Sequence, residues 1–145
     1  MGIKKIVALL GPSRAGKTSS LKALVQDYLR TGADGIFSKQ NSYSRTDTIE
    51  VFEFYGQRIC ISSYGDDDVG INEGYKIALQ YDCDVFVTAS RSRHGSRSLA
   101  KVIRIAVVND VSPIWLGAIK EGNPQRKVKA DLMRCRMLRY VIESL

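Results

Sequence analysis

The feature that most constrains this chain is a glycine-containing segment at residues 11–18, which separates an apolar run from a helix-like run. Gly11, Gly16, Lys17 and Thr18 stand at the spacing G-x-x-x-x-G-K-[ST]. Glycine has no Cβ, so such a loop can turn sharply and point several backbone N–H groups toward one anion. A helix that begins near Lys17 would add unpaired N–H groups and the positive end of its dipole. The spacing therefore predicts a strand, a phosphate-binding loop and a helix in succession.

The residue types in this segment suit a nucleoside triphosphate and Mg²⁺. Lys17 is expected to reach the β- and γ-phosphates as a point charge, and the Thr18 hydroxyl to occupy one site on the metal. Arg14 has two interpretations, a contact with phosphate or a solvated side chain. The predicted cofactor-binding residues are Gly11, Pro12, Ser13, Arg14, Ala15, Gly16, Lys17, Thr18 and Ser19.

Hydrophobic periodicity divides the chain into alternating strands and helices. It predicts strands at residues 3–10, 48–55, 57–62, 84–89 and 113–119, and helices at residues 18–30, 71–80, 99–109 and 127–145. Gly56 lies between two strand-like runs and predicts a tight antiparallel hairpin. Ser96 or Ser98 is the expected N-cap of the third helix. Residues 31–47 have no clear periodicity and are expected to form a long loop, either a lid or switch or a plain connector.

This alternation predicts an α/β fold, a three-layer sandwich. The expected sheet is mostly parallel, with five to six strands, one antiparallel hairpin strand and helices on both faces. A length of 145 residues suits a single domain over residues 1–145. Ligands of such sheets bind at the carboxyl ends of the strands, so the residues after each strand are candidates to share a site with residues 11–18.

Three consecutive carboxylates, Asp66, Asp67 and Asp68, follow the predicted hairpin. A carboxylate at a strand end can hold Mg²⁺ directly or through water, so Asp66 and Asp67 are predicted, with Thr18, as metal ligands. The alternative is a solvated acidic turn at the N-terminus of the next helix. Residues 67–70 also fit the short pattern D-x-x-G.

Arginines follow the next predicted strand. Arg91 and Arg93 are predicted, with Lys17, as catalytic residues, because guanidinium groups can stabilise charge on a transferred phosphoryl group. Arg97 and the single histidine, His94, lie in the same segment. The alternative interpretation of this segment is a solvated basic turn.

The charge is concentrated in the last third of the chain. Residues 1–90 carry 10 Lys and Arg against 11 Asp and Glu, whereas residues 91–145 carry 12 against 4. A segment dominated by one sign of charge indicates an anionic partner, so nucleic acid or an acidic protein is expected to contact basic residues within 91–139. A solvated basic helix face is the alternative, and a homo-oligomer is left open.

The three cysteines, Cys60, Cys83 and Cys135, form no metal or redox motif and are interpreted as buried reduced thiols. No apolar stretch approaches the length of a membrane span, and residues 1–6 have no secretory pattern. These observations predict a cytoplasmic protein without a membrane partner.

Residues 11–18 resemble the Walker A motif of the P-loop NTPase superfamily. The order of the predicted elements is similar to that of the Ras-like GTPase domain, with Thr46 or Thr48 near the switch-I position and residues 67–70 near switch II. GTPases read guanine with the Asp of N-K-x-D, but this chain has Ile119, Lys120 and Gly122 at the corresponding Asn, Lys and Asp positions. The resemblance therefore implies ATP rather than GTP as the nucleotide.

Three functions follow from these patterns. The first is Mg²⁺-dependent binding and hydrolysis of a nucleoside triphosphate, with slow turnover because Ile71 stands where the GTPases have a catalytic Gln. The second is a small kinase, since small P-loop kinases are similar to this chain in size. They also use arginines in the site, a role that Arg91, Arg93 and Arg97 could fill here. The third is a non-catalytic nucleotide-dependent switch whose basic C-terminal surface binds an anionic partner.

Overall fold

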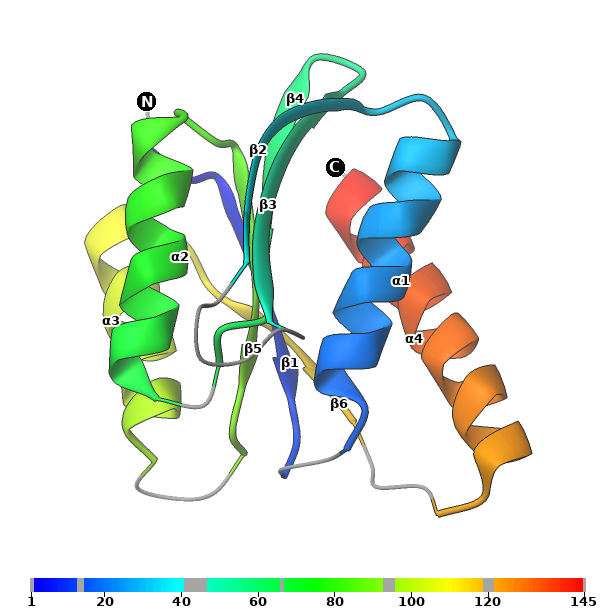
Figure 1. Cartoon of the computed structure of the whole chain (residues 1–145). Helices are drawn as coiled ribbons and strands as arrows, with labels where there is room; N and C mark the ends of the chain where they lie inside the picture. The colour runs from blue at the N-terminus through cyan, green and yellow to red at the C-terminus, as the bar shows by residue number, and fades with distance from the viewer. Residues whose placement is uncertain are drawn as a thin grey trace.

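A six-stranded mixed sheet with strand order β2-β3-β4-β5-β1-β6 forms the centre of the molecule (Figure 1). The computed structural model describes residues 2–12, 15–40, 47–65, 67–92, 96–118 and 122–144. The strands are β1 (Lys5–Leu10), β2 (Asp34–Gln40), β3 (Thr48–Phe54), β4 (Gln57–Ser62), β5 (Val85–Ser90) and β6 (Ile114–Gly117). The helices are α1 (Lys17–Arg30), α2 (Asp68–Gln80), α3 (Arg97–Asn109) and α4 (Pro124–Glu143).

Strand β3 alone runs against the other five strands. It pairs antiparallel with β2 and with β4, whereas β5 pairs parallel with β4 and β1, and β1 pairs parallel with β6. The predicted α/β class, the hairpin and the single reversed strand are therefore confirmed. Strand β5 lies between β4 and β1, so β4, the second strand of the hairpin, is not a neighbour of β1, the strand that leads to residues 11–18.

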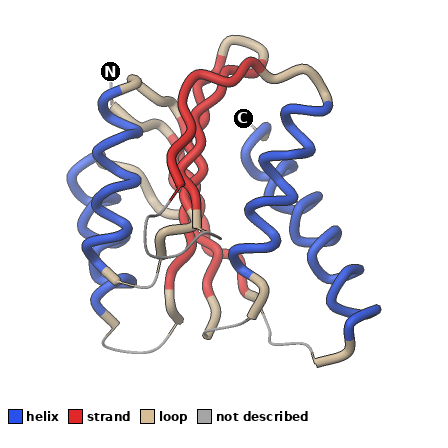
Figure 2. The backbone as a smooth tube through the Cα atoms, viewed as in Figure 1, coloured by secondary structure: helices blue, strands red, loops and turns tan. Residues whose placement is uncertain are grey.

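Helices cover both faces of the sheet, and Figure 2 shows the strands as one layer between them. Helices α1 and α4 pack with Val7 and Leu9 on one face, and α2 and α3 pack with Ile6 and Ala8 on the other. Successive side chains of a strand point to opposite faces, which explains how β1 serves both cores. Strand β5 is buried along its whole length. The three cysteines are buried free thiols, as expected.

The prediction of a long loop at residues 31–47 was wrong for its first half. Residues Asp34–Gln40 form β2, an edge strand in which six of the seven residues are exposed. Since Phe37 is the one residue of this strand that packs against a core, its sequence has no need of the alternating apolar pattern by which a half-buried strand is recognised. The expected lid or switch falls mainly on residues 41–46, which lie outside the described part of the chain.

Capping residues define where the last two helices begin. Ser96 is the N-cap of α3 and accepts a hydrogen bond from the Leu99 backbone N–H, which selects one of the two predicted caps. Asn123 caps α4, and Pro124 occupies its first turn. Helix α4 thus begins earlier than residue 127. Val128 and Leu132, two apolar residues of its first half, are 60% and 52% exposed, because this half of the helix projects beyond the core.

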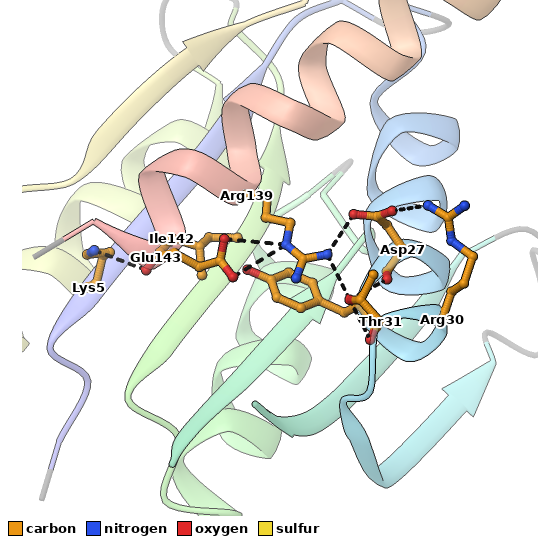
Figure 3. Close-up of polar contacts among 8 residues, drawn as sticks. Lys5, Asp27, Arg30, Thr31, Arg139, Ile142 and Glu143 are labelled. Atoms are coloured by element: carbon orange, nitrogen blue, oxygen red, sulfur yellow. Dashed lines mark hydrogen bonds and ion pairs between the residues drawn. The ribbon is translucent and has the colours of Figure 1, made fainter. Parts of the chain in front are cut away.

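Arg139 joins α4 to α1 (Figure 3). Its guanidinium donates to Asp27 Oδ2 at 2.7 Å and to Thr31 Oγ1 at 2.9 Å, and it lies 4.3 Å from the centre of the Tyr28 ring. Lys5 binds the C-terminal end of α4, where its ammonium donates to the carbonyl oxygens of Val141 and Ile142. These contacts bring the first strand and the last helix together across the whole sequence. Among the described helices, none combines the length and the apolar character needed to cross a membrane.

Candidate functional site

The carboxyl ends of three neighbouring strands meet at Gly11. Its backbone N–H donates to the Ser90 carbonyl at the end of β5, and the Ala118 N–H, just after β6, donates to the Leu10 carbonyl. A Cβ on Gly11 would lie 2.6 Å from the Ala118 carbonyl oxygen. Such an approach is closer than a side chain permits, so the packing of β6 requires glycine here. The loop therefore begins at the edge of the sheet where α/β proteins bind ligands.

Gly16 ends the loop and is the N-cap of α1. Its φ of +88° lies in the left-handed region, where residues with a Cβ are strained. The Ala15 N–H donates to the Pro12 carbonyl at 3.3 Å. Ser13 and Arg14, predicted to bind the cofactor, lie outside the described residues. The strand predicted before Gly11 and the helix predicted after Gly16 are confirmed.

Lys17 points back into the loop from the first turn of α1. It is only 7% exposed, and its ammonium donates to the Gly11 carbonyl and, at 3.2 Å, to the Pro12 carbonyl. A buried ammonium held by backbone carbonyls is a fixed positive charge on the inner side of the loop. The α1 N-terminus contributes a second positive field at the same place. This arrangement suits a phosphate group.

Asp47 is brought to Thr18 by the fold. The Thr18 hydroxyl donates a hydrogen bond of 3.1 Å to Asp47 Oδ1. Two adjacent oxygen ligands of octahedral Mg²⁺ lie about 2.9 Å apart, given metal–oxygen distances of 2.0–2.1 Å. These two oxygens could therefore hold one Mg²⁺ side by side. Sequence reasoning missed Asp47, and the available signal was its position directly before a predicted strand, in the segment singled out as a lid or switch.

The predicted metal carboxylates after the hairpin have a different setting. Asp66 lies outside the described residues. Asp67 is the N-cap of α2, and its Oδ1 accepts a hydrogen bond of 2.8 Å from the Gly70 N–H. Asp67 therefore has the capping role that was the alternative interpretation of this turn. A Cβ on Gly65 would lie 2.2 Å from the Ala89 carbonyl oxygen, so the chain after β4 crosses the end of β5.

Arg91 follows the β5 residue that contacts Gly11. Its backbone N–H donates to Ser98 Oγ at 3.2 Å, and its carbonyl accepts from the Ser90 hydroxyl at 3.1 Å. These bonds hold the start of the arginine segment beside the loop, and the Arg91 side chain is half-buried. Arg93 and His94 lie outside the described residues. Of the two predicted catalytic arginines, Arg91 is thus the one whose backbone position near residues 11–18 can be stated.

Two residues of α4, Asp131 and Arg134, hold the loop and the first turn of α1. Asp131 accepts hydrogen bonds from the hydroxyls of Ser19 and Ser20 at 3.0 and 3.1 Å. Arg134 donates to Ser20 Oγ at 2.9 Å and to the Ala15 carbonyl at 3.3 Å. The hydroxyl of Ser19, a predicted cofactor-binding residue, therefore points toward α4. No local pattern could have identified this pair, because it lies more than 100 positions from the residues that it binds.

Tyr64 has a buried hydroxyl that makes no hydrogen bond within the described part of the chain. Burial raises the pKa of this phenol, and the charges of Glu73 and Asp47 raise it further. Tyr64 is therefore neutral at physiological pH, and it lies within electrostatic reach of the carboxylate that contacts Thr18.

The comparisons with protein-family models, curated proteins and solved structures gave no match to this chain. Within the described ranges, no cluster of three or more His, Cys, Asp or Glu side chains could hold a metal ion. A metal at Thr18 and Asp47 would take its other ligands from phosphate oxygens and water, which is the usual coordination of Mg²⁺ in nucleotide sites.

Proposed function

We propose that this chain is a P-loop NTPase that binds a nucleoside triphosphate with Mg²⁺ at residues 11–18 and hydrolyses it slowly. The observation that carries the proposal is Lys17, whose ammonium is buried inside the loop between Gly11 and Gly16. This combination of a strand-end glycine, a left-handed glycine and an inward lysine before a helix is the arrangement that cradles phosphates.

Each residue of the site has a role in this proposal. The backbone N–H groups at the start of α1 and the Lys17 ammonium bind the phosphates, for which Lys17 exchanges its carbonyl partners. Thr18 and Asp47 hold the metal, which neutralises phosphate charge when it is bound. Arg91 is proposed to contact the transferred phosphoryl group. Asp131 and Arg134 fix the loop and take no part in the chemistry.

The proposal favours ATP and slow hydrolysis. The carboxylate that reads guanine in GTPases is replaced by Gly122, which has no side chain to recognise the base. Ile71, at the place of the water-positioning Gln, belongs to α2, is fully buried in the core between this helix and the sheet, and cannot orient water. The kinase alternative depends on Arg93 as well as Arg91 and stays a prediction.

Calorimetric titration with Mg²⁺ and ATP or GTP tests the proposal. We expect wild-type protein to bind Mg·ATP more tightly than Mg·GTP, and Lys17→Ala to lower the affinity at least tenfold. Lys22→Ala removes the same charge about one and a half turns further along α1 and should leave the affinity unchanged. Asp47→Asn should weaken binding in Mg²⁺ but not in EDTA, because only the metal-dependent part is lost. If the wild type bound neither nucleotide, the proposal would be wrong.

A further inference from the structure

The outer face of α4 carries a stripe of basic and apolar side chains. We define the α4 stripe as Arg126, Lys129, Met133, Arg136 and Tyr140, which recur at helical spacing along one side of the helix. The buried residues of α4, Cys135, Leu138 and Ile142, point to the core on the other side. All members of the stripe are exposed, with Met133 at 61% and Tyr140 at 76%.

The cations of the α4 stripe differ from the other arginines of the same helix. Arg134 is bound by Asp131 and Arg139 by Asp27, and both guanidinium groups are largely buried by these contacts. Arg126, Lys129 and Arg136 form no ion pair with any residue in the described part of the chain. Their charges therefore face solvent, which leaves them able to bind an external anion.

The acidic residues of α4 are directed away from the stripe. Asp131 accepts hydrogen bonds from Ser19 and Ser20 of α1, and Glu143 pairs with Arg139 (Figure 3). From residue 126 to residue 140 the exposed side of the helix therefore has only positive charge. The stripe spans about 21 Å at 1.5 Å per residue, a length that suits several nucleotides of an extended strand.

We propose that the α4 stripe binds single-stranded nucleic acid. The three cations would contact successive phosphates, and Tyr140, which is mostly exposed, would stack on an unpaired base. An extended single strand of nucleic acid exposes its phosphates and its base faces together. A duplex stacks its bases inside, so a protein helix that lies on its surface reaches only phosphates unless it enters a groove. An acidic protein would bind the three cations of the α4 stripe, but it would offer the Tyr140 ring no base to stack on.

Fluorescence anisotropy with a labelled oligonucleotide of about 20 nucleotides, at about 50 mM salt and without nucleoside triphosphate, tests this proposal. The variant K129E/R136E should lower the affinity at least tenfold. The control K101E/R104E makes the same change in net charge on α3, which lies on the opposite face of the sheet, and should change the affinity less than twofold.

Y140A should weaken binding several-fold, whereas Y140F should bind like the wild type, because it keeps the ring.

The salt dependence gives a second readout. Three phosphate contacts with a single strand predict a slope of about −2 in a plot of log K against log salt, and K129E/R136E should flatten it. Equal losses in the two double variants, binding of polyglutamate or duplex DNA as tight as that of the single strand, or no binding by the wild type would overturn the proposal. Since the assay contains no triphosphate, its outcome is independent of the function proposed for residues 11–18.

Discussion

At the scale of single residues, backbone conformation and close approach explain the loop. Gly11 is required because the end of β6 approaches its Cα, and Gly16 because α1 begins from a left-handed residue. Lys17 follows in the first turn of α1, and its side chain folds back to the carbonyls of Gly11 and Pro12. Packing and backbone conformation therefore explain the two glycines without any ligand.

Tyr28 provides a test of how buried polar atoms affect the core. Its side chain is fully buried between Phe52 and Phe54, and its hydroxyl has no hydrogen-bond partner in the described ranges. Burial is also the main cause that raises its pKa. Because an unsatisfied buried hydroxyl is destabilising, Tyr28→Phe should leave the free energy of unfolding unchanged or raise it by about 1 kcal/mol. Urea denaturation measures this, and a clear loss of stability would show that the hydroxyl has a partner.

At the scale of elements, the junction of α1 and α4 connects the folding of the chain to its candidate sites. Asp131 and Arg134 bind the loop and the first turn of α1, while Arg139 binds the last turn of the same helix. Helix α4 thus contacts α1 at two places, which lie about one and a half to two turns apart along α4. Its inner side positions residues 15–20, and its outer side carries the α4 stripe.

The Asp27–Arg139 contact makes the stability of this junction depend on pH. The hydrogen bond from Arg139 is the largest cause that lowers the pKa of Asp27 in the folded chain. A carboxyl whose pKa is lower in the folded state stabilises the protein above its unfolded pKa of about 3.9, and this contribution is lost as the pH falls through the folded pKa.

Asp27→Asn should therefore lower the free energy of unfolding at pH 7 by about 1 kcal/mol, since the pair is partly exposed. The difference from the wild type should disappear below the folded pKa of Asp27. Chemical denaturation from pH 7 down to about pH 2 measures both effects. Asp34→Asn, at an exposed position of β2, is the matched control and should have no effect. A stability difference that is the same at every pH would contradict this account.

At the scale of the whole molecule, one sheet supports two apolar cores. Strands β1 and β5 contribute side chains to both cores, and β5 is buried throughout. Loss of either helical layer would expose these central strands, so neither core can unfold while the other remains. The edge strands β2 and β6 depend on this centre and are themselves mostly uncovered.

We therefore expect a single cooperative unfolding transition. The only tryptophan, Trp115, lies on the edge strand β6 and is 37% exposed, so its fluorescence reports on the periphery of the sheet. Far-UV circular dichroism reports on all helices and strands together. The two signals should change at the same urea concentration if the edge and the centre unfold as one unit. A tryptophan transition at lower urea would show that β6 detaches first.

Local sequence patterns were enough to predict every helix and every strand except β2, together with the position of residues 11–18 between the first strand and the first helix. Apolar runs, glycines and capping residues act over a few positions, so β1, residues 11–18, α1 and the hairpin could be predicted from local spacing. Strand β2 could not be, because its exposed edge position removes the pattern that identifies strands.

The residues that meet at the loop could not be predicted in this way, because they are brought together by the tertiary fold. Asp47 reaches Thr18, and Asp131 and Arg134 reach Ser19, Ser20 and Ala15, across separations that no local pattern encodes. The insertion of β5 between β4 and β1 likewise depends on how the helices fill the two faces of the sheet. The physical reason is that local conformation depends on neighbouring residues, whereas strand order and long-range contacts depend on the packing of the whole chain.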